Sequence, residues 1–198
     1  NRSSGRMGYA LARAAHRRGA DVTLVTGPVS LAPPRGCRMV RVETAAEMNE
    51  VMRAHAVASD LVIMVAAVAD YRAYEAVDSK IKKDKAGLEL RLERTEDILT
   101  GLSRARGKRV LVGFAAETND LINNAIAKLH AKGLDLIVAN DVTEEGSGFD
   151  TETNSAVLID RDGGRETTGL LPKTELAERI LTRSLELVSA AGLVAERA

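Results

Sequence analysis

Residues 60–70 read Asp-Leu-Val-Ile-Met-Val-Ala-Ala-Val-Ala-Asp, and this stretch decides the fold class. Positions 61–65 are apolar without interruption, as a central strand covered on both faces of a parallel sheet must be. The run ends in small residues and Asp70 at the carboxyl end of the expected strand, where open α/β sheets bind ligands. Small side chains would let a planar group approach the backbone closely. A well-packed strand with a solvated Asp70 explains the same residues equally well.

Short apolar runs and helical patterns alternate on both sides of this strand. Further strands are predicted over residues 21–26, 37–42, 109–114 and 134–139, and helices over residues 7–18, 44–55, 97–104, 119–132 and 173–190. Residues 155–160 and 165–168 predict a hairpin around Asp162-Gly163-Gly164. Thr44 and Glu47 have the spacing of a capping box. The alternation predicts an α/β fold, a Rossmann-like and mostly parallel sheet with flanking helices.

The alternation breaks over residues 70–96, which hold Tyr71, Tyr74, a basic run at 80–85 and the alternating sequence Leu-Glu-Leu-Arg-Leu at 88–92. This composition predicts a loop and an exposed β-arm. An exposed, alternating strand edge favours pairing with a second copy of the chain, so we expect a homodimer formed through the arm.

Composition excludes several classes of protein. The 198 residues carry 28 basic and 28 acidic side chains, so no global field draws the chain to nucleic acid or anionic lipid. Aromatic residues make up 3% of the chain, which leaves few stacking platforms for single-stranded nucleic acid. The longest apolar run, residues 61–69, is far shorter than the roughly 20 residues of a membrane span. One cysteine, Cys37, and three histidines supply neither an internal disulfide nor a zinc cluster, which fits a reducing, cytoplasmic compartment.

The first residues hold a candidate anion site. Ser3-Ser4-Gly5-Arg6-Met7-Gly8 contains the last two glycines of a G-x-G-x-x-G pattern and opens a helix, whose first amides could face an anion. A tight turn in which Gly8 permits close helix packing explains the pattern about as well. Because the chain opens on Asn1 in a loop-like stretch, we expect a strand to precede it in a longer polypeptide. Thr26-Gly27-Pro28 offers no carboxylate for a ribose hydroxyl, which disfavours NAD.

Three further features admit two interpretations each. The basic run at 80–85 is most simply a solvated loop, but beside a nucleotide its lysines would neutralise phosphate charge. Lys128 and Lys132 are four residues apart on one helix face, so they either meet the same triphosphate or form a polar flank, which the sequence slightly favours. Asn140 and Asp141 follow a predicted strand and either contact a ligand or cap the connection.

Five motifs occur in one order along the chain. They are Asn1-x-Ser-Ser-Gly-x-Met-Gly, Ala66-Ala67-Val68-Ala69-Asp70-Tyr71, Lys80-Ile81-Lys82-Lys83, Val112-Gly113-Phe114-Ala115-Ala116-Glu117-Thr118 and Ala139-Asn140-Asp141-Val142. Together they closely resemble phosphopantothenoylcysteine synthetase, the second half of the bacterial bifunctional enzyme of coenzyme A biosynthesis. The resemblance covers nearly the whole chain, and five ordered motifs are far more specific than one glycine turn.

The resemblance implies a dimeric, CTP-dependent ligase. The carboxylate of 4′-phosphopantothenate would attack the α-phosphate of CTP, giving an acyl-cytidylate and pyrophosphate, and the amine of L-cysteine would then displace CMP. Mg²⁺ would accompany the triphosphate, on ligands that the resemblance does not identify. Lys80 looks like the lysine that supports acyl-cytidylate formation, and Asn1 like the asparagine that holds this intermediate for the amine.

The resemblance also assigns binding residues. The nucleotide would be surrounded by Met64, Val65, Ala66, Asp70, Lys80, Glu96, Asp97, Ile98, Leu99, Phe114, Lys128 and Lys132, and the anion-binding turn would consist of Ser3, Ser4, Gly5 and Gly8 together with Asn1. Glu96 stands where the family often has proline, which questions the loop conformation there.

We therefore expect one CTP-binding ligase domain over residues 1–198. The family's upstream glycine-rich strand and loop, and its flavin-dependent decarboxylase half with FMN, lie outside this sequence. Two rival functions are a nicotinamide-dependent reductase on the same fold and a module that binds a nucleotide without turnover.

Overall fold

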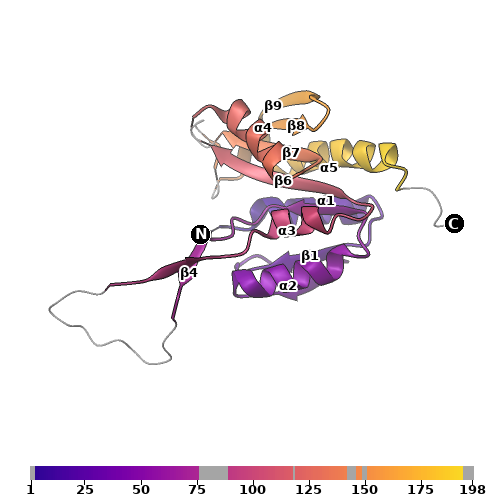
Figure 1. Ribbon diagram of the computed structural model, residues 1–198. Coiled ribbons are helices and arrows are strands. Elements are labelled where there is room, and N and C mark those ends of the chain that lie inside the picture. The colour runs from indigo at the N-terminus through magenta and orange to yellow at the C-terminus, as the bar shows by residue number, and fades with distance from the viewer. Residues whose placement is uncertain (1–2, 76–88, 118, 142–145, 149–150, 194–198) are drawn as a thin grey trace.

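A computed structural model describes residues 3–75, 89–117, 119–141, 146–148 and 151–193 (Figure 1). Its central sheet has five strands in the order β3-β6-β7-β8-β9. The strands β3 (Leu61–Met64), β6 (Val110–Glu117) and β7 (Leu136–Asp141) are parallel, and β8 (Thr153–Asp160) and β9 (Arg165–Pro172) form an antiparallel hairpin at the edge. The predicted α/β class and mostly parallel sheet are confirmed.

Helices cover both faces of this sheet. α1 (Arg6–Arg17) and α5 (Lys173–Ala190) pack on one face, and α2 (Ala45–Ala56), α3 (Ile98–Arg104) and α4 (Leu121–Ala131) on the other. Side chains alternate along β7, so Leu136 and Val138 join the α1–α5 core while Ile137 and Ala139 join the opposite one. A strand buried on both faces must be apolar throughout, which explains the uninterrupted run that predicted β3.

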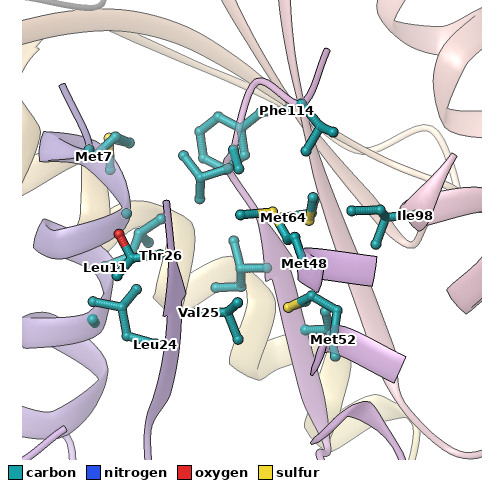
Figure 2. Close-up of a pocket in the computed structure, with 18 of the residues that line it drawn as sticks. Met7, Leu11, Leu24, Val25, Thr26, Met48, Met52, Met64, Ile98 and Phe114 are labelled. Atoms are coloured by element: carbon teal, nitrogen blue, oxygen red, sulfur yellow. The ribbon is translucent and has the colours of Figure 1, made fainter. Parts of the chain in front are cut away.

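A second, smaller sheet lies beside the first. β1 (Thr23–Thr26) and β2 (Arg38–Arg41) pair in parallel, and among the described residues neither pairs with the five-stranded sheet. The alternation of strands and helices in the sequence would place β1 and β2 in the same sheet as β3, whereas the structure separates them. β1 and β3 face each other across an elongated cavity, which we call the trough (Figure 2).

The backbone of both strands is half paired along the trough. In a parallel ladder, alternate residues of a strand bind one neighbour and the residues between them point the other way. Val22 and Asp60 accept hydrogen bonds from β2 and β6, at 2.8 Å from Arg38 N and 2.9 Å from Val110 N. The alternation therefore directs the backbone groups of the next residues into the trough: Thr23 and Val25 on β1, and Leu61 and Ile63 on β3.

An arm extends from the body of the molecule (Figure 1). It consists of the antiparallel pair β4 (Tyr71–Ala73) and β5 (Leu92–Arg94), braced by an ion pair of 2.7 Å between Arg72 and Glu93. Leu90 and Leu92 are 62% and 56% exposed. The predicted antiparallel arm is present, but its strand β5 begins at Leu92, where the run expected at 88–92 ends. Leu88 and the basic run at 80–85 fall outside the described residues.

Most element boundaries agree with the sequence pattern. The capping box is confirmed, since Glu47 N donates to Thr44 Oγ1 at 3.1 Å and Thr44 N to Glu47 Oε2 at 3.3 Å. β6 continues to Glu117, beyond the predicted end at Phe114, because its pairing with β7 extends to Asp141. None of the helices in the described ranges combines the length and the apolar character that a membrane span requires.

The turn between β8 and β9 contains a buried ion pair. Asp160 is 2% exposed, pairs with Arg183 and accepts hydrogen bonds from Gly164 N at 2.8 Å and Asp162 N at 3.0 Å. Burial alone would raise the pKa of Asp160, but the guanidinium and the N–H groups outweigh it and hold the pKa below its usual value. Because the pKa of Asp160 is lower in the folded than in the unfolded protein, its ionised carboxyl stabilises the fold at pH values above the unfolded-state pKa. This stabilisation is lost as the pH falls toward the folded-state pKa.

We expect Asp160→Asn to destabilise the fold by about 2 kcal/mol at pH 7, because it weakens hydrogen bonds to a charged, buried group. The difference from wild type should shrink as the pH falls below about 4, because the carboxyl then becomes protonated in the unfolded chain before it does in the folded one. Urea unfolding of wild type and variant, at pH 7 and again below about pH 4, measures this difference in the free energy of unfolding. Asp162→Asn, at an exposed position of the same turn, is the control and should change little. A destabilisation of Asp160→Asn that is the same at both pH values would contradict the argument.

Candidate functional site

One cavity of about 1420 Å³ joins the trough to the carboxyl ends of the parallel strands. The trough is apolar: Figure 2 shows Val25 of β1 and Met64 of β3 on its two sides, Leu11 of α1 at one wall, and Met48 and Met52 of α2 at the other. The other part, which we call the polar end, lies where β3, β6 and β7 end and α1 begins. It combines backbone amides, three lysines and several carboxylates and amides.

The described residues that the resemblance assigned to a site all line this cavity. They are Ser3, Ser4, Gly5, Gly8, Met64, Val65, Ala66, Asp70, Glu96, Asp97, Ile98, Leu99, Phe114, Lys128 and Lys132. Asn1 and Lys80 lie outside the described residues. Residues from six separate parts of the chain thus converge at one end of the sheet, as expected for a ligand site in an open α/β fold.

The start of α1 lies between the ends of β1 and β3. Gly5 has a φ of 74° at the N-cap, where a Cβ would lie 2.9 Å from Val29 Cγ1, so glycine suits both the conformation and the space. A Cβ on Gly8 would lie 4.0 Å from Val65 Cβ. The first backbone bond of the helix runs from Tyr9 N to Gly5 O at 3.0 Å, so the preceding amides are those that a helix N-terminus offers to an anion.

Both lysines of α4 reach the polar end. Lys128 Nζ donates to Phe114 O at 3.0 Å, on β6 next to the residue at which its pairing with β3 ends. Lys132 Nζ lies 3.1 Å from Asp97 Oδ2, at the start of α3. The helical spacing that predicted a shared face is correct, and two positive charges adjoin the strand ends where a phosphate chain would lie.

Hydrogen bonds to separate parts of the chain hold the turn at residues 95–97. Thr95 donates to the carbonyls of Ala69 and Asp70, through Oγ1 at 2.5 Å and N at 2.9 Å. Glu96 accepts from Asn49 Nδ2 of α2 at 2.5 Å. Glu96 occupies the position where the family often has proline. The hydrogen bond between its side chain and α2 fixes the loop there.

Asp97 caps α3 by accepting from Thr100 N at 3.1 Å. Burial would raise the pKa of Asp97, but the Thr100 N–H and Lys132 outweigh it and lower the pKa, so the carboxylate is ionised at neutral pH. Other predicted residues are less accessible: Met64, Ile98 and Leu99 have buried side chains in the core. Polar contacts from these three residues to a ligand can come only from their backbone groups.

The described residues contain no group of three or more His, Cys, Asp or Glu side chains arranged to hold a metal ion. Asp70 is an exposed carboxylate at the polar end. Mg²⁺ bound to nucleotides commonly takes one or two protein carboxylates and fills its remaining positions with phosphate oxygens and water. The donor set here fits an ion of that kind, with Asp70 as its protein ligand, rather than an all-protein metal site.

The sequence pattern missed part of the polar end. Lys173 is 5% exposed, and its Nζ donates to Gly148 O at 2.8 Å and Thr151 O at 2.6 Å. Asn154 is 3% exposed and accepts from Ser147 Oγ at 2.7 Å. The predicted strand began after Asn154, and a lysine at a helix start carries no signal of burial, so neither residue was a candidate.

Comparison with known proteins decides the family. Residues 1–187 match the family described as the DNA/pantothenate metabolism flavoprotein C-terminal domain. The chain belongs to this family. The resemblance read from the five ordered motifs is confirmed.

Members of the flavoprotein C-terminal domain family with curated names align over most of the chain. The coenzyme A biosynthesis bifunctional protein CoaBC of Bacillus subtilis is 46% identical over 91% of this chain and 45% of its own length. The protein of the same name from Vibrio parahaemolyticus is 43% identical over 95% of this chain and 48% of its own length. The chain therefore spans about half the length of these relatives.

Solved structures of the family agree with the fold. The C-terminal domain of a CoaBC protein superposes with a TM-score of 0.82 at 38% identity, over 96% of this chain and 86% of that one. A Cab2 mutant in complex with phosphopantothenate-cysteine superposes with a TM-score of 0.77 at 14% identity, over 96% of this chain and 80% of that one. The second likeness concerns the fold alone.

Proposed function

We propose that this domain is the CTP-dependent ligase of coenzyme A biosynthesis, joining 4′-phosphopantothenate to L-cysteine. The observation that carries the proposal is the convergence of the anion-binding turn of α1, the ends of β3 and β6, and Lys128 and Lys132 of α4 on one cavity. Triphosphate recognition needs backbone amides and cations at one place, and this cavity supplies both.

The reaction proceeds in two displacements. A carboxylate oxygen of phosphopantothenate attacks the α-phosphorus of CTP, forming an O–P bond and breaking the bond to pyrophosphate, which leaves with the electron pair. The neutral amine of cysteine then attacks the acyl carbon, forming the C–N bond, breaking the C–O bond and releasing CMP, while its extra proton passes to water. Activation is needed because a carboxylate is a poor electrophile until its oxygen joins a good leaving group.

Each part of the cavity has a role in this scheme. The first amides of α1 hold an anionic group of the acyl intermediate, and Lys128 and Lys132 hold the phosphates of CTP. Mg²⁺ held by Asp70 and the triphosphate would neutralise phosphate charge. Lys80 supports the departure of pyrophosphate, and Asn1 presents the intermediate to the amine.

Pyrophosphate release on adding CTP and phosphopantothenate to the longer native polypeptide tests the proposal. We expect release that depends on both compounds, followed by CMP and phosphopantothenoylcysteine once cysteine is added. CTP binding without pyrophosphate release would indicate a nucleotide-sensing module. Tight NADPH binding that CTP does not affect would indicate a reductase.

The arm is proposed to form a homodimer. Leu90 and Leu92 are exposed beside the edge of β5, and an exposed apolar strand edge is stabilised by pairing with an identical one. Light scattering on the longer polypeptide should give twice the mass of one chain. Leu92→Lys places a charge in this edge and should shift the protein toward monomer, whereas a single-chain mass for wild type would refute the proposal.

The trough is proposed to hold the strand that precedes Asn1 in the longer polypeptide, upstream of which the flavin-dependent decarboxylase half would bind FMN. α1 begins at the carboxyl ends of β1 and β3, so a strand leading into it through the trough runs parallel to both. In that polypeptide, we expect the amides of Val25 and Ile63 to exchange with deuterium as slowly as those of Leu24 and Val62. Exchange of Val25 and Ile63 at the rate of exposed loops would contradict the assignment.

A further inference from the structure

Asn140, near the end of β7, has a side chain that the fold does not satisfy. Its Oδ1 is buried, lacks a hydrogen-bond partner within the described part of the chain, and belongs to a residue that lines the cavity. A buried acceptor without a partner destabilises a fold, so its presence here calls for an explanation. The sequence left two interpretations of Asn140, a ligand contact or a cap. A capping side chain accepts a hydrogen bond from a backbone N–H, and among the described residues the oxygen of Asn140 accepts none, so it is not a cap.

The strand register explains why the amide is left unsatisfied. Asn140 lies opposite Ala116 on β6 and Ala156 on β8. Paired residues project from the same face of a sheet, so the amide stands between two methyl groups that neither bind it nor fill the space above it. Asn140 follows Val138 by two residues and therefore lies on the α1–α5 face, the face from which α1 starts.

A buried cation lies in the lining of the same cavity. The buried Lys173 is fixed by the carbonyls of Gly148 and Thr151, and Arg6 of α1 pairs with Glu152. Arg6, Lys173 and Asn140 line the same cavity. A ligand that donates an N–H group and carries a carboxylate matches an amide acceptor in such a field, and a free amino acid has both groups.

We propose that Asn140 Oδ1 binds the amino group of the amino-acid co-substrate and directs it toward the acyl intermediate held at the start of α1. This inference rests on the proposed ligase function and assigns the second substrate to a subsite of its own. Asn140 acts by positioning, since an amide oxygen accepts a hydrogen bond but does not take the proton. The first displacement, which does not involve the amine, should not depend on it.

Steady-state and half-reaction kinetics of the longer polypeptide test the assignment. Asn140→Leu and Asn140→Ala remove the acceptor, and we expect the KM for cysteine to rise by about 10-fold or more while the KM for CTP and the rate of pyrophosphate release without cysteine stay unchanged. Asn123→Leu, at an exposed position on α4, is the matched control and should alter none of these.

Asn140→Asp supplies a readout that a purely structural role would not move. Its carboxylate keeps the acceptor but stabilises the protonated amine, so kcat should fall at neutral pH and recover as the pH rises, without a large increase in the KM for cysteine. A KM for cysteine within two-fold of wild type in both apolar variants would overturn the proposal, as would an equal loss of pyrophosphate release. Wild type that releases no pyrophosphate would refute the ligase function itself, and this inference with it.

Discussion

Lys80→Gln is expected to lower the rate of pyrophosphate release by about 100-fold to 1,000-fold, the loss typical of removing one group that stabilises charge in a transition state. Negative charge moves onto pyrophosphate as the α-phosphorus is attacked, and a lysine beside that oxygen stabilises the transition state more than bound CTP. Glutamine keeps the length and polarity of the side chain but not its charge. CTP affinity should therefore change much less than the rate.

The segment of the chain that contains Lys80 is attached to the cavity by the base of the arm. Lys80 lies in sequence between β4 and β5, and the base of that arm is fixed to the polar end by hydrogen bonds from Thr95 to Ala69 and Asp70. Rapid-quench measurement of pyrophosphate gives the rate, and calorimetry the affinity. Lys108→Gln makes the same change at an exposed position that does not line the cavity and serves as the control. A Lys80→Gln rate above about a tenth of wild type would contradict the role, since so small a loss is below that of one transition-state contact.

Local patterns predicted the elements, whereas pairing between distant strands did not follow from them. The apolar run of β3 and the capping box of α2 are local features, and both are confirmed. The separation of β1 and β2 from the central sheet depends on what lies between β1 and β3, which periodicity does not report. The extra length of β6 is likewise set by its partner β7.

The site shows the same division between local and tertiary information. The four motifs that fall on described residues predicted segments that line the cavity, because each lies at the end of a strand or the start of a helix. They could not predict that Asp97 holds Lys132, or that Asn49 holds Glu96, since these contacts join residues far apart in sequence. Asn140 was ambiguous for the same reason, because the sequence does not show that its side-chain oxygen is buried without a hydrogen-bond partner among the described residues.

Asn1→Asp is expected to separate the two displacements. Pyrophosphate should still be released in a single turnover, but the formation of phosphopantothenoylcysteine should fall by about 100-fold or more, as when a donor to a developing oxyanion is lost. The change keeps the shape of the side chain, removes its N–H donor and adds a negative charge. Near the phosphate of an acyl-cytidylate, that charge repels the group which the amide would hold.

In the sequence, Asn1 adjoins a turn that lines the cavity, which is why we expect the second displacement to depend on it. Asn1 precedes Ser3 by two residues, and the Ser3–Gly8 turn lies between the ends of β1 and β3, beside the cavity that also contains Asn140. Quenched reactions analysed by mass spectrometry should show the acyl-cytidylate accumulating in Asn1→Asp and absent in Lys80→Gln. Asn123→Asp, the same chemical change on the exposed surface of α4, should behave as wild type. If Asn1→Asp and Lys80→Gln lost the same step, the two residues would act together on one transition state, because separate roles require an intermediate that one variant forms and the other does not.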